Sequence, residues 1–344
     1  MKCGMVEQGF ARGSCLTKVP DGTLKQACEA TLKRKGDTWH RLIKSIHLSR
    51  PEDYLSIYQS GCSHKCLKCH SWYFSKVVDG HFYSTDEIAE RVAEYEETVT
   101  VEEPRKRALM YFATDLCRHC GSCIIKDEYG PLCPRKLSPT QILLSPQGYG
   151  PARNIVAFTG GDLTCCADFY VQVTEKIKAQ CENIWVLLET NGYGLTPHNL
   201  DKFEAAGVDS YWLDIKAYDE KIYKKLCGAT NEWILKAPQE IVDRGFALEV
   251  LTLFIPNWVE TDQITKIAEL IAEIDPSIPF SILAFFPEYK LQNVPRPTLM
   301  QMLKSYFAVK DIGLKNIRLG NVGVFAKTQD EWNTLLALAG EDAI

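Results

Sequence analysis

Three cysteines with close, regular spacing follow a hydrophobic stretch near residue 60. The segment GCSHKCLKCHSWYF places them three and then two residues apart, as Cys62, Cys66 and Cys69. Three thiolates can hold three irons of a [4Fe–4S] cluster and leave the fourth iron open to a small molecule. A zinc site completed by His64 or His70 would use the same sulfurs. The spacing alone does not separate these two interpretations.

The position of the three cysteines favours the iron–sulfur interpretation. They follow the predicted strand YLSIYQSG (54–61), and parallel α/β folds gather their chemistry where strands end. The aromatic residues at 72–74 come next and could shield a cluster from water. We therefore expect His64 and His70 to form hydrogen bonds in the loop rather than to ligate a metal.

A second set of four cysteines lies farther along the chain. The pattern CxxCxxC, followed after nine residues by CP, gives Cys117, Cys120, Cys123 and Cys133. Four thiolates suit an iron–sulfur cluster, a single iron or a zinc ion. We expect an auxiliary iron–sulfur cluster here in preference to a single Fe or Zn. Such a centre could pass electrons inward or simply hold its own loop together.

Seven further cysteines lie outside these two sets: Cys3, Cys15, Cys28, Cys165, Cys166, Cys181 and Cys227. The first three are irregularly spaced, which argues against a third metal site. The adjacent pair follows a Gly-Gly-Asp turn and could line the site, although packing in the core explains it equally well. We expect the last two to be small buried hydrophobic side chains.

The elements that must position these residues alternate between strand and helix. Seven short apolar runs predict strands at 54–61, 154–161, 184–192, 209–216, 247–255, 280–286 and 315–321. Helical patterns lie between most of them, at 166–181, 197–206, 219–244, 260–274 and 297–313. Nearly continuous apolar runs are typical of strands buried on both faces. The alternation predicts an α/β fold with a parallel sheet, either a barrel or an open doubly wound sheet.

Polar residues at the predicted strand ends resemble those of a known family. The CxxxCxxC loop and the FTGGD turn (158–162) are similar to motifs of the radical S-adenosylmethionine (radical SAM) superfamily. Three later stretches resemble its branch of glycyl-radical-enzyme activases: LLETNGYG, WLDIKAYDEKIYKKLCGATNEWIL and FFPEYKLQNVPRPT. The resemblance covers most of residues 51–325. It implies a partial (β/α)6 TIM-like barrel and a [4Fe–4S] cluster whose open iron binds SAM. It also implies cleavage of SAM to methionine and a 5′-deoxyadenosyl radical.

The resemblance also implies roles for residues at the strand ends, beyond cluster ligation by Cys62, Cys66 and Cys69. These residues are Gly160, Gly161, Asp162, Glu189, Thr190, Asn191, Asp214 and Lys216. The Gly-Gly-Asp turn would face the methionine moiety of SAM, although the family has Glu where this chain has the shorter Asp162. The Glu-Thr-Asn run would lie near SAM. Asp214 and Lys216 would act as catalytic residues beside SAM and substrate, or else form an ion pair that orders a strand end.

The chain divides around this core into five parts: an N-terminal extension (1–50), the first strand and cluster loop (51–76), an inserted cysteine-rich metal-binding subdomain (77–150), the rest of the barrel (151–328) and a C-terminal helix (329–344). The insertion begins with a charged stretch at 84–107 that we expect to be helical. The extension is basic, with ten Lys or Arg and four Asp or Glu. It could touch an acidic partner, although a solvated amphipathic arm is the simpler expectation.

Composition excludes several classes of protein. The 344 residues are 46% hydrophobic and carry a formal net charge of −5, which argues against general nucleic-acid binding. The first residues have no apolar signal-peptide core, and no run of about 18 apolar residues could span a membrane. We therefore expect a cytoplasmic protein without membrane contact. In that reducing compartment, 14 cysteines indicate metal binding rather than disulfides.

Three functions are consistent with this pattern. The first is a cobalamin-dependent C-methyltransferase that takes hydrogen from a peptide carbon of a protein substrate. Methanogen enzymes that methylate residues of methyl-coenzyme M reductase, such as glutamine, resemble this plan and share a tail like RLGNVGVFAKT. The chain has no DxHxxG cobalamin box.

The second function is a glycyl-radical-enzyme activase, and the third is a non-catalytic iron–sulfur or zinc protein. A ferredoxin or flavodoxin would supply electrons to either enzyme. We favour the methyltransferase over the activase because it gives the N-terminal extension a task.

Overall fold

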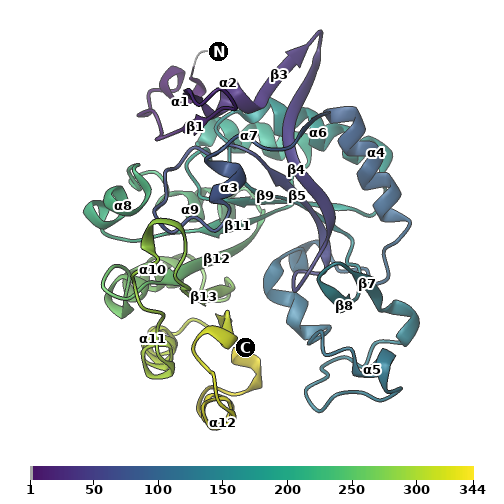
Figure 1. Cartoon of the computed structure of the whole chain (residues 1–344), viewed down its shortest axis with the longest axis vertical. Helices are drawn as coiled ribbons and strands as arrows, with labels where there is room; N and C mark the ends of the chain where they lie inside the picture. The colour runs from purple at the N-terminus through teal and green to yellow at the C-terminus, as the bar shows by residue number, and fades with distance from the viewer. Residues whose placement is uncertain (1–2) are drawn as a thin grey trace.

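The computed structural model describes residues 3–344, and its centre is one curved sheet (Figure 1). Within that range, seven strands of the sheet run parallel and lie side by side in chain order. They are β5 (Tyr54–Gln59), β9 (Ile155–Gly160), β10 (Trp185–Thr190), β11 (Ser210–Asp214), β12 (Ala247–Phe254), β13 (Phe280–Ala284) and β14 (Ile317–Gly320). Their side chains are almost all buried, as the apolar runs predict. This confirms the partial TIM-like barrel.

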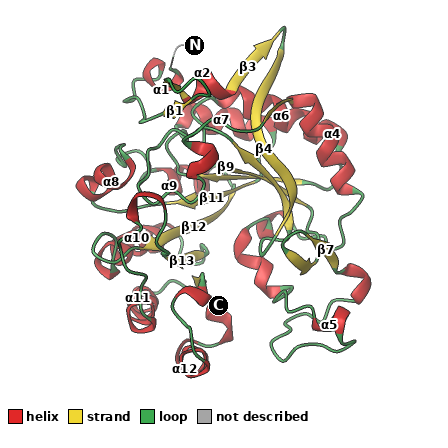
Figure 2. Cartoon of the chain, in the orientation of Figure 1, coloured by secondary structure: helices red, strands yellow, loops and turns green. Residues whose placement is uncertain are grey.

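The helices that follow the strands surround the sheet (Figure 2). They are α6 (Ala167–Gln180), α7 (Pro197–Ala206), α8 (Glu220–Cys227), α9 (Ala237–Asp243), α10 (Thr261–Ile274), α11 (Leu299–Ile312) and α12 (Gln329–Ala339). Apart from α8, neighbouring helices pack on one another: α6 on α7, α7 on α9, α9 on α10, α10 on α11 and α11 on α12. The single helix predicted over 219–244 is wrong. The chain turns at Gly228, whose φ of 73° ends α8 in the left-handed region. Asn231 then donates to the carbonyls of Ala217 and Tyr218 and holds the turn.

The N-terminal extension belongs to the fold rather than forming a solvated arm. It contains α1 (Gly4–Glu7), β1 (Leu16–Lys18), β2 (Leu24–Gln26), α2 (Ala27–Thr31), β3 (Leu32–Lys35) and β4 (Thr38–Ser49). The long strand β4 pairs antiparallel with β5 and with β3, so the extension adds an edge to the main sheet. Met5, Ala27 and Arg41 are buried. Sequence reasoning missed this because a strand's partner lies outside its local pattern.

The first part of the span predicted as an insertion joins the main sheet and its helix layer, and the predicted helix is shorter than expected. After α3 (Trp72–Ser75), strand β6 (His81–Ser84) pairs with β4, and α4 (Thr85–Glu96) starts at a capping box. The helix stops at Glu96, well short of residue 107, because a β-branched run and Pro104 follow.

Short elements carry the rest of the insertion: the 3₁₀ turns Arg105–Arg107, Met110–Asp115 and Pro139–Gln141, the helix α5 (Ser122–Ile125) and the hairpin β7 (Leu143–Ser145) and β8 (Gly148–Gly150). In Figure 1 this region forms a lobe beside the barrel. No helix among residues 3–344 is long and apolar enough to cross a membrane.

Candidate active site

A cavity of about 490 Å³ opens where the parallel strands end. Ten of the residues predicted to form the site line it: Cys62, Cys66, Cys69, Gly160, Asp162, Glu189, Thr190, Asn191, Asp214 and Lys216. Gly161 lies just behind the wall, where a Cβ atom would come within 2.2 Å of the Gly61 carbonyl oxygen. Only glycine lets the cysteine loop and the turn after β9 approach this closely. The fold therefore brings the predicted residues to one place.

The environment of the three cysteines fits thiolate ligands. A hydrogen bond from Cys227, together with the charges of Lys216 and Lys76, lowers the pKa of the buried Cys66 thiol to about 5. Burial alone would lower the pKa of Lys76, but the three cysteines raise it. The lysines therefore balance the negative charge that a cluster held by three thiolates would carry.

In residues 3–344 as they stand, no three His, Cys, Asp or Glu side chains are arranged to ligate a single metal ion. The two histidines of the cysteine loop have other partners. Nε2 of His64 lies 2.9 Å from the hydroxyl of Tyr223, and burial lowers the pKa of His64 well below its usual value. His70 is exposed, with Nδ1 3.9 Å from a carboxylate oxygen of Glu288. Neither ring is placed to complete a zinc site with the three sulfurs.

Asp162 ties two loops of the cavity wall together. One carboxylate oxygen accepts from the backbone N–H and hydroxyl of Thr164, at 2.8 and 2.9 Å. The other accepts from the Thr190 hydroxyl and the Asn191 N–H, both at 2.8 Å. With four such bonds the carboxylate is occupied within the protein, so its first effect is to position Thr190 and Asn191. The Asn191 amide in turn donates to Ser63, 3.0 Å away, beside Cys62.

Arg41 supports the same region from the N-terminal extension. Its guanidinium donates to the carbonyls of Gly61 and Gly161, at 3.2 and 3.3 Å, and to Gln59. The side chain is fully buried. Arg41 thus holds the cysteine loop and the Gly-Gly-Asp turn in register. Nothing in the local sequence marked it, because its partners lie up to 120 residues away.

Glu189 is a neutral acid at neutral pH. Burial raises the pKa of its carboxyl to about 8, although Thr159 and Tyr54 donate hydrogen bonds to it. The Tyr54 hydroxyl lies 2.8 Å from one carboxyl oxygen. Tyr54 and Thr159 thus add polar groups beside Glu189 at the cavity wall.

Asp214 and Lys216 form an ion pair at the cavity wall, and a third residue joins them. Nζ of Lys68 lies 3.6 Å from the same carboxylate oxygen of Asp214 that Lys216 contacts. The other oxygen, Oδ1, is buried without a hydrogen-bond partner in residues 3–344. Burial would raise the pKa of Asp214, but the two lysines hold it below its usual value. The carboxylate is therefore charged and keeps one oxygen free to accept.

The opposite side of the cavity is apolar. Six side chains from later strands form it: Trp212, Leu251, Leu253, Leu283, Phe285 and Phe286. The cavity thus has a polar half beside the cysteines and an apolar half beside β12 and β13. Lys68 lies between Cys66 and Cys69 and Lys76 follows shortly after them in the sequence, and that closeness was a signal of their place in the site.

The second cysteine set surrounds a much smaller space. A cavity of about 20 Å³ is lined by all four of Cys117, Cys120, Cys123 and Cys133. Such a volume admits little more than one water-sized atom. Four soft thiol donors around one small space fit a metal centre.

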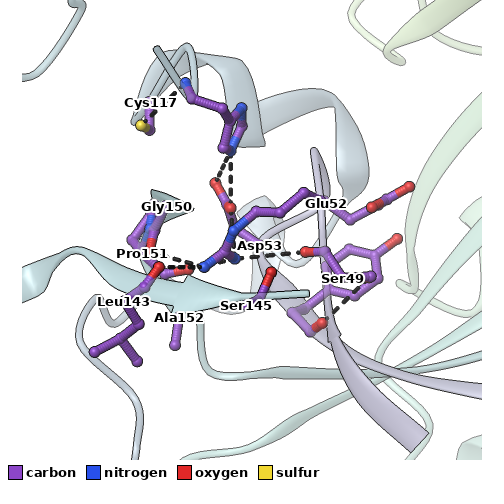
Figure 3. A network of polar contacts seen from close by, with 12 residues as sticks. Ser49, Glu52, Asp53, Cys117, Leu143, Ser145, Gly150, Pro151 and Ala152 are labelled. Carbon is purple, nitrogen blue, oxygen red and sulfur yellow. Dashed lines mark hydrogen bonds and ion pairs between the residues drawn. The ribbon is translucent and has the colours of Figure 1, made fainter. Parts of the chain in front are cut away.

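Figure 3 shows how this second set is attached to the barrel. Nε2 of His119, between two of the cysteines, lies 2.9 Å from both carboxylate oxygens of Asp53. Arg50 pairs with Asp53 at 2.8 Å and donates to the carbonyls of Gly150 and Pro151, each at 2.8 Å. Asp53 precedes β5, whereas Cys62 follows it. The attachment therefore lies at the end of β5 opposite the three-cysteine loop, and Glu52, beside Asp53, also lines the large cavity.

Comparisons with known proteins identify related sequences. The Radical SAM superfamily profile matches residues 113–264. A protein of Methanocaldococcus jannaschii, whose name places it with glycyl-radical enzyme activating enzymes, is 31% identical over 57% of this chain and 72% of its own length. An uncharacterised protein of the same organism is 28% identical over 60% of each chain.

Comparison with solved structures found matches at low similarity. A domain of pyruvate-formate lyase-activating enzyme from Bacteroides vulgatus is 20% identical with a TM-score of 0.41, over 48% of this chain and 98% of that one. Streptococcus suis SuiB is 13% identical with a TM-score of 0.48, over 80% of this chain and 50% of its own. The first of the two Methanocaldococcus jannaschii relatives is 31% identical and is matched over 72% of its own length. Together with the superfamily profile, this match shows that the chain belongs to the radical SAM superfamily.

Proposed function

We propose that the mouth of the barrel binds a [4Fe–4S] cluster and SAM, and that this enzyme removes a hydrogen atom from a protein substrate. The observation that carries the proposal is the large cavity itself. Three thiols, a polar wall and an apolar wall meet there around about 490 Å³. A closed metal site has no use for such a volume, whereas a cluster that admits a second molecule requires it.

The residues divide the work of binding. Cys62, Cys66 and Cys69 would hold the cluster, which when bound supplies the electron that cleaves SAM to methionine and a 5′-deoxyadenosyl radical. Asp214 lines the cavity and would hold the ammonium groups of Lys216 and Lys68 beside SAM and substrate. Thr190 and Asn191, held by Asp162, line the polar half. The apolar half excludes water from the radical chemistry.

Activation of a glycyl-radical enzyme is the outcome that the comparisons favour. The relative named as an activating enzyme supports it, because it matches this chain over most of its own length. The protein substrate would then present a backbone glycine at the apolar wall. A ferredoxin or flavodoxin would supply the electron.

Cobalamin-dependent C-methylation of a protein, for example a glutamine of methyl-coenzyme M reductase, is the second candidate. The apolar wall of Trp212, Leu251 and Phe285 favours it, because a flat, largely apolar ring could lie there beside SAM. The DxHxxG box is absent, so the corrinoid would have no histidine from that motif.

One experiment separates the two outcomes. The anaerobically reconstituted protein is first mixed with hydroxocobalamin without reductant, and the corrinoid spectrum is recorded against free hydroxocobalamin; SAM and dithionite are then added for turnover. A methyltransferase would bind the corrinoid and change its absorption. An activase would leave the corrinoid free and would produce a glycyl radical, seen by electron paramagnetic resonance, in a glycyl-radical enzyme mixed with it. If SAM is cleaved but neither signal appears, both outcomes are contradicted.

The second cysteine set would hold an auxiliary metal centre within this function. Its four thiols close the space without leaving a larger cavity beside them. Its attachment through His119 and Asp53, at the far end of β5, supports a role in holding the insertion on the barrel.

A further inference from the structure

A third group of cysteines meets behind the loop that carries Cys62. A cavity of about 20 Å³ is lined by five thiols that are far apart in the sequence: Cys3, Cys15, Cys28, Cys165 and Cys166. The first three come from the N-terminal extension and the last two follow the Gly-Gly-Asp turn. All five are free cysteines. Neither the superfamily match nor the proposed SAM site gives these residues a task.

Several of the five thiols lie close to one another as well as to apolar neighbours. Cys28 lies within reach of Cys166, and Cys166 lies within reach of Cys165. Cys15 is close enough to Cys28 and Cys3 for their charges to act on it. If these cysteines were simply small hydrophobic side chains, nothing would require them to share a cavity.

The backbone around the cavity is built for close approach. A Cβ atom on Gly13 would lie 2.6 Å from the Ser63 carbonyl oxygen, and one on Gly4 would lie 3.2 Å from the Cys165 carbonyl oxygen. Glycine at these positions lets the extension lie directly against the barrel. The segment is also fixed by polar contacts, since Gln8 bonds to Asn199 at 3.1 Å and to Thr196 at 2.6 Å. The thiols are therefore held in place by the fold.

We propose that Cys3, Cys15 and Cys28, with the Cys165–Cys166 pair, form a third metal centre of this protein. The ligand chemistry is that of a thiophilic metal, either an iron–sulfur cluster or a single iron or zinc ion. The cavity matches the volume enclosed by the four cysteines of the insertion, about 20 Å³ in each case. No three of these side chains among residues 3–344 are arranged to ligate an ion as they stand, so the proposal requires the cysteine side chains to rotate toward the metal. Five thiols exceed the four that one tetrahedral ion takes, so one of the adjacent pair serves as the spare.

The centre joins the extension to the wall of the SAM site. Ser63, next to Cys62, lines the same cavity, as does Tyr193, two residues beyond Asn191. The Tyr193 hydroxyl also donates to the carbonyl of Ala11 in the extension. A metal held here fixes the cysteine loop from behind, through residues adjacent to both the cluster ligand and the polar wall.

Metal content of paired variants tests this proposal. The full chain is reconstituted anaerobically, and iron, zinc and acid-labile sulfide are measured per chain in the wild type, in Cys15→Ser/Cys28→Ser and in Cys165→Ser/Cys166→Ser. The two double variants change opposite sides of one cavity, so we expect both to lose the same single centre. Cys181→Ser is the matched control, because that thiol contacts Glu96 instead, and it should lose none. Iron lost with equal sulfide identifies a cluster, whereas zinc or sulfide-free iron identifies a single ion.

Thiol footprinting keeps the proposal falsifiable if a variant folds poorly. The reconstituted wild type is alkylated before and after treatment with a chelator, and each cysteine is followed by mass spectrometry. We expect Cys3, Cys15, Cys28 and one thiol of the Cys165–Cys166 pair to become reactive together when metal is removed. Unchanged metal content in either double variant, or equal reactivity of the five thiols before and after chelation, would overturn the proposal. A disulfide between them in anaerobically purified protein would also overturn it.

Discussion

The cysteines at the two ends of β5 sit in spaces of very different size. At the carboxyl end, three thiols border a cavity of about 490 Å³ with charged and apolar walls. At the amino end, through His119 and Asp53, four thiols enclose about 20 Å³. A count of sulfurs alone would describe the first site as incomplete. The space beside the sulfurs distinguishes a centre that admits a second molecule from one that is closed.

The charged side chains around the two cysteine sites also differ. The open site is lined by charged side chains. Lys68, Lys76 and Lys216 lie around the cysteines and Asp214. The closed site is tied down by a buried network in which Asp53 and Arg50 use their charges on fixed partners. The first arrangement suits ligand binding, and the second suits anchoring of an inserted segment.

Removing a ligand at the open site should have the largest effect. Cys66→Ala should reduce 5′-deoxyadenosine formation from SAM and dithionite to the level without enzyme, because two thiolates cannot hold the cluster. Cys227→Ala is the matched control, since it removes only a hydrogen-bond donor to Cys66 and should retain measurable cleavage. Cleavage that survives in the Cys66 variant would mean that other residues hold the cluster.

Breaking the Asp53–Arg50 network, at the amino end of β5, should destabilise the fold while leaving the three-cysteine ligand set unchanged. Asp53→Asn leaves Arg50 buried without its charge partner, so we expect a loss of about 3 kcal/mol in the free energy of unfolding. Asp201→Asn, at an exposed pair with Arg244, should cost at most about 0.5 kcal/mol. Urea unfolding under anaerobic conditions measures both. Equal losses in the two variants would remove the anchoring role.

The protonated Glu189 carboxyl at the wall of the open cavity predicts a dependence of stability on pH. Burial raises the pKa of Glu189 to about 8 in the folded chain, against about 4.5 when exposed. Between these values the folded state holds a proton that the unfolded state has released. Stability therefore falls as pH rises from 6 to 8, by about 2 kcal/mol from this group. Glu189→Gln should remove this part of the pH dependence of the free energy of unfolding, measured with urea. The same pH dependence in the variant and in the wild type would refute the prediction.

A ligand change at the closed site should have the smallest effect on SAM cleavage. Cys133→Ser should lower the metal content and the melting temperature, because the insertion loses its centre. Cleavage of SAM should stay within about twofold of wild type, since distant sites act independently. A loss as complete as that of Cys66→Ala would show that the insertion's centre delivers the electron.

Local sequence patterns predicted much of the barrel and much of the large cavity. The strands are short apolar runs with polar ends, so both the parallel sheet and the gathering of Asp162, Asn191 and Asp214 follow from local pattern. Distant contacts were not predictable in this way. The pairing of β4 with β5, the role of Arg41 and the meeting of Cys28 with Cys166 depend on segments that only the fold brings together. The break between α8 and α9 depends on Gly228 adopting a left-handed conformation, which the helical pattern around it concealed.

The central claim is that the three-cysteine site is open in order to bind SAM. Its most direct test is chromatographic measurement of 5′-deoxyadenosine and methionine after the reconstituted, reduced protein is mixed with SAM under anaerobic conditions. The account predicts that both products form in equal amounts and that Cys133→Ser protein forms them too. If the [4Fe–4S] cluster is shown to be assembled and reduced and neither product forms, the account is contradicted.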